Sequence, residues 1–225
     1  MRLPLALLLM GLPLPLAAQA DRVPETGPTP GAFIPAGYLL LKEVRGHLNG
    51  DERGDVVLIV GDRRERIDSI VDDLPPRLLL VLHGTATGFR LAVASATAVY
   101  GKLEGGSFGD PLDDLALERN VIVLSHLGGS AWRWRYVHRF RFQQGDYRLI
   151  GRAETTFFTG RRCDRLREFR PTTHQDDNYN TGRRYRYEVP EDRCVKRERR
   201  ETIRVGPLTL LREFVLREDA AAGNR

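Results

Sequence analysis

Short apolar runs separated by turn-forming residues occupy most of the chain between residues 37 and 189. The runs are rich in Val, Leu, Ile and aromatic residues, which favour β-strands. They read GYLLLKEV, DVVLIV, RLLLVLHG, GFRLAVAS, NVIVLSHL, WRWRYVHRFRF, DYRLIGR and RYRYEV. The pattern predicts a mainly β protein made of antiparallel sheets, with one or two short helices.

The strictest alternation of residue types runs from residue 132 to residue 142. Rings occupy its even positions, and the odd positions hold Arg133, Arg135, Val137, Arg139 and Arg141. A period of two is typical of a strand, so we expect the rings, Trp132 and Trp134 included, to face inward and the arginines outward. A turn at 143–146 and a partner strand at 147–150 follow. Residues 183–189 repeat the pattern, with Tyr185, Tyr187 and Val189 on one face and Arg184, Arg186 and Glu188 on the other.

Helical periodicity is scarce. The best candidate helix is 62–73, where Ile67, Ile70 and Val71 follow a spacing of three and four residues. A weaker helix is predicted at 113–118. Residues 90–99 fit a strand or a helix equally well.

The amino-terminal end has the layout of a secretory signal peptide. A single Arg precedes a Leu-rich run, and Ala18-Gln19-Ala20 forms a cleavage site before Asp21. We expect residues 1–20 to be removed and the protein to be periplasmic or secreted. An uncleaved anchor is the alternative, but the run is short for a bilayer, and no later stretch is apolar enough to span one.

The rest of the chain divides by composition. Residues 21–36 carry four prolines and two glycines and are predicted to form an extended linker. Residues 37–216 are predicted to form one β-rich domain, in which the charged stretch 152–216 extends the sheet. The charged, Ala-rich tail at 217–225 is predicted to be disordered.

Only two cysteines occur, Cys163 and Cys194. In an exported chain such a pair favours a disulfide, which would staple the carboxy-terminal extension and contribute roughly 3–4 kcal/mol. Two reduced thiols are the alternative. A metal site is not expected here because no C-x-x-C pair exists.

Lys and Arg number 35 against 30 Asp and Glu, a net charge of +5. Outside the cytoplasm this mild excess of positive charge favours anionic polysaccharide, lipid headgroups or acidic proteins as partners. Nucleic acid is not expected, because that compartment contains little of it.

The loop GHLNGDERGDVVLIV at 46–60, together with the later RLLLVLHGTATGFRLA, resembles one unit of the FG-GAP/VCBS type, over roughly residues 38–92. The stretch that continues to Gly151 is similar in layout to small exported bacterial proteins of uncharacterised function. The first resemblance implies a sheet like a β-propeller blade, whereas the strand pattern alone also fits a sandwich. In FG-GAP/VCBS units a loop of this kind binds calcium.

Mapped onto this chain, that calcium site would use Asn49, Asp51 and Asp55. His47 stands where the family has an Asp, and Glu52 replaces a Gly, so two features of the calcium loop are missing. The favoured interpretation is therefore a turn in which the Asn49 and Asp51 side chains bond nearby amides. We expect no cofactor, with calcium as the alternative.

No catalytic motif stands out. The motifs H-E-x-x-H and G-x-S-x-G are both absent. Ser130, His126 and Asp110 form a triad only on paper, and the histidines are better explained as packed side chains. We therefore expect a non-catalytic envelope protein with a binding or structural role. A hydrolase or transferase with an unrecognised site is the alternative.

The candidate binding residues are Arg133, Arg135, Arg139 and Arg141. Residues two apart on a strand are separated by about 6.6–7 Å, so these guanidinium groups would form a line suited to an anionic polysaccharide or lipid headgroups. Arg184 and Arg186 would widen this line if their strand is a neighbour. The alternative is a solvated face whose charges are neutralised by nearby carboxylates.

Overall fold

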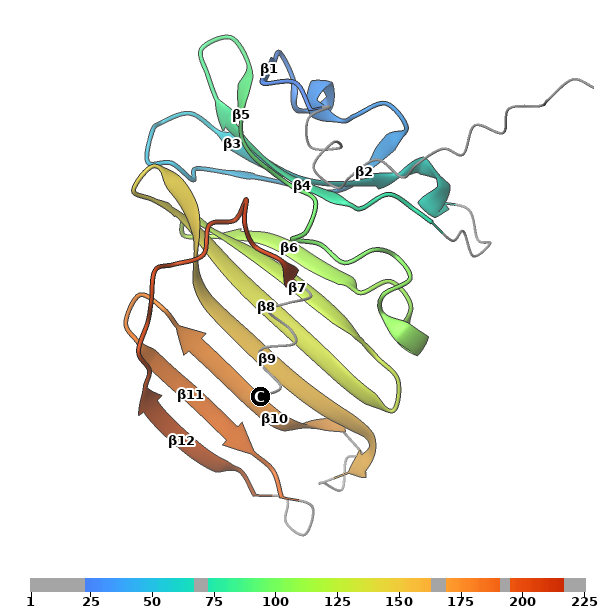
Figure 1. The fold of residues 1–225 in the computed structure, drawn as a ribbon, viewed down its shortest axis with the longest axis vertical. Coiled ribbons are helices and arrows are strands. Elements are labelled where there is room, and N and C mark those ends of the chain that lie inside the picture. The colour runs from blue at the N-terminus through green and yellow to red at the C-terminus, as the bar shows by residue number, and fades with distance from the viewer. Residues whose placement is uncertain (1–22, 67–72, 163–168, 191–194, 217–225) are drawn as a thin grey trace, which may run out of the picture.

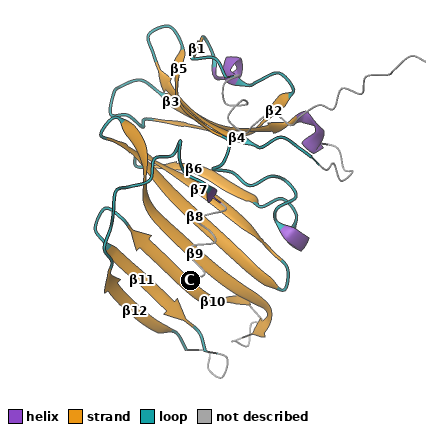
Figure 2. Cartoon of the chain, viewed as in Figure 1, coloured by secondary structure: helices purple, strands orange, loops and turns teal. Residues whose placement is uncertain are grey.

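The computed structural model describes residues 23–66, 73–162, 169–190 and 195–216, which fold into two antiparallel sheets (Figure 1, Figure 2). The predicted signal peptide, the tail 217–225 and both cysteines lie outside these residues. The predicted fold class, mainly β with antiparallel sheets, is confirmed. No helix among the described residues is long and apolar enough to cross a membrane.

The smaller sheet has five strands in the order β1-β5-β4-β3-β2. They are β1 (Thr26–Gly27), β2 (Tyr38–Gly46), β3 (Asp55–Asp62), β4 (Leu78–Gly84) and β5 (Phe89–Ser95). The larger sheet has seven strands that follow the chain in sequence, from β6 at one edge to β12 at the other. They are β6 (Leu112–Glu118), β7 (Val121–Gly129), β8 (Trp132–Gln143), β9 (Asp146–Arg162), β10 (Phe169–Asn178), β11 (Arg183–Glu188) and β12 (Arg197–Thr202).

One core joins the two sheets in a sandwich-like arrangement. Val57 and Ile59 on β3 and Val81 on β4 are fully buried and belong to the same cluster as Ile122 and Phe140 of the larger sheet. Each such side chain contributes roughly 1.5–3 kcal/mol when it is removed from water. The five-stranded sheet covers the β6–β8 end of the larger sheet, whereas β10–β12 extend beyond it (Figure 1).

The opposite face of the five-stranded sheet is buried as well, and this changes the interpretation of the predicted linker. Leu58 and Leu80 pack against Val23 and Phe33, which come from the stretch predicted to be extended. Its described part, 23–36, contains β1 and the 3-10 helix η1 (Pro30–Phe33), and Phe33 is completely buried. Because β3 and β4 are apolar on both faces, a second cover is needed, and this Pro-rich segment supplies it.

One of the two predicted helices is replaced by a strand. Residues 113–118 lie within β6, where Leu115 is opposite Leu124 of β7, so the helix expected there is wrong. The ambiguous stretch 90–99 is a strand as far as Ser95. Of the candidate at 62–73, the 3-10 helix η2 (Arg63–Arg66) is formed, and 67–72 lie outside the described residues. A third short helix, η3, spans Gly106–Phe108.

The alternation predicted for residues 132–142 is confirmed as strand β8. Tyr136, His138 and Phe140 are buried, and Phe140 lies in the core between the sheets. We call this side of the seven-stranded sheet its inner face, and the side with the arginines its outer face. Trp132 is the departure: it is 57 % exposed because its end of β8 lies outside the core, where it stacks on Phe158 at 4.7 Å.

The carboxy-terminal part of the described chain returns to the core. After β12, residues 203–216 run back toward the five-stranded sheet (Figure 1), and Leu211, Phe214 and Leu216 are buried in the shared core. Strands β9 to β12 thus continue the larger sheet, and the chain that follows them packs against its inner face.

Candidate functional site

All four predicted arginines of β8 lie on the outer face, where β7 and β9 flank them. Two of them already contact acids. An Arg135 Nη atom lies 3.0 Å from the Asp113 carboxylate, and its Nε donates to Ser125 Oγ at 3.1 Å. The closest ion-pair approach of Arg139 to Asp176 is 3.6 Å. The solvated, partly neutralised face foreseen as the alternative therefore describes the middle of the line.

The two ends of the line differ from its middle. The Arg133 guanidinium lies over the Phe108 ring, 4.9 Å from its centre. Arg141 is directly opposite Arg148 on β9, and the described residues offer neither of these two an acidic partner within ion-pair distance. Like charges directly opposite one another destabilise a strand pair. An anion bound at this end would remove that repulsion.

Arg184 and Arg186 do not widen the line, because β9 and β10 separate β11 from β8. The register aligns Arg186 with Gln175, Glu154 and Tyr136 in one row across the sheet, which places it on the inner face. The alternation predicted within residues 183–188 is confirmed, but the face that each set occupies is the reverse of the one expected.

The tyrosines of β11 consequently share the outer face with the arginine line. Tyr187 stacks on His174 at 5.2 Å, and the Lys196 ammonium lies 4.5 Å from the centre of the Tyr187 ring. Arg200 lies over Tyr185 at 5.9 Å. Cationic groups over aromatic rings are attracted by the negative ring face. The outer face therefore combines positive charge with aromatic surface from β8 to β12.

A cleft of about 370 Å³ lies on the inner face of β9–β12. One row of paired residues crosses it from β9 to β12: Glu154, Gln175, Arg186 and Arg199. The next row contains Thr156, Thr173, Glu188 and Arg197. Trp134 and Tyr136, which stack at 4.9 Å, continue the two rows on β8.

Sequence reasoning missed this cleft. Its lining comes from four strands, and the alternation on β11 was the one sign of it in the sequence. The side chains meet because residues directly opposite on neighbouring strands point to the same face. Such partners depend on the register of each pair, which the sequence alone did not give.

The predicted calcium residues form a hydrogen-bonded turn. Asp55 is completely buried, and its two carboxylate oxygens accept the amides of Leu48 at 2.7 Å and Gly84 at 3.0 Å. Asn49 Oδ1 accepts the Asp51 amide, and Asp51 Oδ1 accepts the Arg53 amide. That last bond holds the pKa of Asp51 below its ordinary value. The oxygens thus serve the backbone, which does not fit a calcium site, and the FG-GAP/VCBS resemblance stays a prediction.

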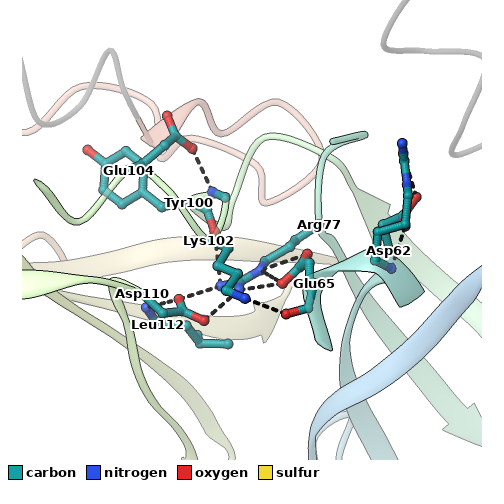
Figure 3. Close-up of polar contacts among 10 residues, drawn as sticks. Asp62, Glu65, Arg77, Tyr100, Lys102, Glu104, Asp110 and Leu112 are labelled. Atoms are coloured by element: carbon teal, nitrogen blue, oxygen red, sulfur yellow. Dashed lines mark hydrogen bonds and ion pairs between the residues drawn. The ribbon is translucent and has the colours of Figure 1, made fainter. Parts of the chain in front are cut away.

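The densest cluster of charges surrounds Arg77, whose side chain is 1 % exposed (Figure 3). It donates to Glu65 on η2 and to Asp110 before β6, with shortest contacts of 2.5 and 2.6 Å. Lys102 Nζ donates to the Glu65 carbonyl. Burial opposes ionisation of Asp110, but hydrogen bonds from Arg77 outweigh it and keep the pKa of Asp110 below its ordinary value. The cluster fastens η2 and the loop before β6 to β4.

The catalytic triad considered from the sequence, Ser130, His126 and Asp110, does not form. His126 is completely buried, and Tyr100 packs edge-on against it at 5.3 Å. Burial lowers the pKa of His126 to about 3, so the ring is neutral. Ser130 lies on the surface beside Phe108 and Arg133. No group of three or more His, Cys, Asp or Glu among the described residues is placed to hold a metal ion.

Comparison with known proteins does not identify the protein. No family model matches the chain, and no curated protein matches it. The function has to be inferred from the faces of the sheet.

Proposed function

We propose that the protein is an exported, non-catalytic binding protein of the cell envelope that holds an acidic polysaccharide on the outer face of the seven-stranded sheet. The observation that carries this proposal is the pair Arg141 and Arg148, which stand opposite each other without an acidic partner in the described chain.

The geometry of the outer face supports a long, linear ligand. Arginines two residues apart along β8 are about 6.6–7 Å apart. Strand β8 pairs with β7 without a register shift from Arg133 to Arg141, which keeps these arginines on one face. Guanidinium groups bind carboxylate and sulfate oxygens through paired N–H donors, which gives both affinity and orientation. A bound anion at Arg141 and Arg148 gains attraction from both groups and also relieves their mutual repulsion.

The middle of the line contributes less. Arg135 and Arg139 must give up their contacts with Asp113 and Asp176 before they can bind the ligand. The loss of these contacts offsets part of the binding free energy. We therefore place most of the affinity at the end of β8 formed by Arg141 and Arg148.

Retention on immobilised heparin tests the proposal, with Arg141→Glu/Arg148→Glu as the variant. Charged hydrogen bonds contribute about 1.5–3 kcal/mol each, so losing two weakens binding by more than about a hundredfold. Arg45→Glu/Arg90→Glu makes the same change of charge on the five-stranded sheet and should retain most of the binding.

Equal retention of both double variants would mean that net charge alone is responsible and would refute the proposed site. Vesicles with and without anionic lipid serve as a second probe. Binding to those vesicles in preference to heparin would assign the outer face to a membrane surface instead.

A further inference from the structure

We propose that the cleft on the inner face is a second binding site and that it takes a sugar carrying a single carboxylate. This site is separate from the one proposed above, because it lies on the opposite face of the sheet and contains none of the arginines of β8 or β9 proposed there. It lies on the part of the sheet that extends beyond the five-stranded sheet (Figure 1).

The positive charge of the cleft is concentrated at β11 and β12. Arg186 and Arg199 stand directly opposite each other, and Arg186 forms an ion pair with Glu201 at 2.7 Å. Within the described chain Arg199 has no acid within ion-pair distance. Opposed like charges are unfavourable unless an anion lies between them. This is the position for the carboxylate, which a guanidinium group binds through two N–H donors.

The acids of the cleft limit the charge of the ligand. Glu154 pairs with Arg152 at 2.8 Å, and Glu188 lies 3.9 Å from Arg197 at their closest ion-pair approach. After these pairs and the pair of Arg186 are counted, one cation remains, which is Arg199. The two glutamates would repel a phosphate or another polyanion in the same space. The cleft is therefore matched to a ligand with one negative charge.

The remaining lining fits a ligand rich in hydroxyl groups. Thr156 and Thr173 share a hydrogen bond of 2.7 Å between their hydroxyls, and Gln175 donates from its side-chain amide to Asp177 at 3.1 Å. Hydroxyls, an amide and carboxylates together offer both donors and acceptors, as the ring hydroxyls of a sugar require. The stacked rings of Trp134 and Tyr136 border this lining on β8.

Titration with methyl β-D-glucuronide and methyl β-D-glucoside tests the site, since the two sugars differ only at C6, which is a carboxylate in the first and a hydroxymethyl group in the second. Binding is followed by NMR shifts of the Thr173 amide and the Gln175 side-chain amide. We expect the glucuronide to bind about tenfold more tightly than the glucoside, and Arg199→Gln to remove this difference. Arg90→Gln is the control, and its affinity should match that of the unchanged protein.

Three results would overturn the site: equal affinity for the two sugars, unchanged glucuronide binding by Arg199→Gln, or displacement of the glucuronide by inorganic phosphate. The melting temperature of Arg199→Gln should be equal to or above that of the unchanged protein, and a lower one would mean that Arg199 has a structural role. Arg141→Glu/Arg148→Glu should bind the glucuronide normally, so this site and the outer-face site can fail independently.

Discussion

The buried cluster around Arg77 allows the sharpest test of how the two sheets are held together. We consider Arg77→Met, which keeps much of the volume and removes all the donors. Arg77 is 1 % exposed and Glu65 4 %, so the substitution leaves the Glu65 carboxylate in the interior without its partner. Asp110 is 43 % exposed and regains water more readily. Breaking a buried ion pair from one side costs about 3–5 kcal/mol, and we expect a loss in that range.

Urea unfolding measured on four proteins gives the coupling within this cluster: the unchanged chain, Arg77→Met, Glu65→Gln and the double variant. The double variant leaves no charge unpaired at η2, so it should be more stable than Arg77→Met alone. Asp110→Asn should cost less than Arg77→Met, because that carboxylate is partly solvated. A loss below about 1 kcal/mol for Arg77→Met, or strictly additive losses, would refute the view that Glu65 depends on Arg77.

Two further predictions concern buried polar groups. Because burial lowers the pKa of His126 to about 3 while the unfolded chain has an ordinary value near 6.5, only the unfolded state gains this proton as the pH falls. The free energy of unfolding should therefore be fully retained above about pH 6.5 and fall by up to about 1.4 kcal/mol per pH unit below it. The variant His126→Phe should show a weaker dependence on pH. Parallel plots of unfolding free energy against pH for the variant and the unchanged protein would contradict this prediction. Asp55→Ala should lower stability by about 3 kcal/mol in urea, because the amides of Leu48 and Gly84 lose a charged acceptor. The melting temperature of the unchanged protein should be the same in calcium and in chelator. A higher melting temperature in calcium would support a calcium site at this loop.

The arginine line illustrates what short-range sequence information can and cannot give. The order of residues from 132 to 142 was sufficient to predict a strand with arginines on one face, and β8 has that form. The acids that meet those arginines come from β6 and β10, so their contacts depend on how the strands are ordered and registered. The same holds for Arg148, whose position opposite Arg141 follows from the register of the hairpin.

The helix predicted at 113–118 and the predicted linker differ from the structure for a related reason. Residues 115–118 are Leu, Ala, Leu and Glu, which favour a helix, but pairing with β7 decided their conformation. The prolines of 21–36 led to the prediction of an extended linker and did not reveal that Phe33 would cover a sheet face.

What the sequence by itself determined is the direction of each side chain along its own strand, because the pleat repeats every two residues whatever the neighbours are. The tertiary structure decided which face of the sheet each set of side chains joins. Arg186 and Arg135 lie on opposite faces although both alternate with aromatic rings, since the faces are set by the register across β9 and β10. Strand pairing is a long-range property, and so the cleft and the outer face appear only once the sheet is assembled.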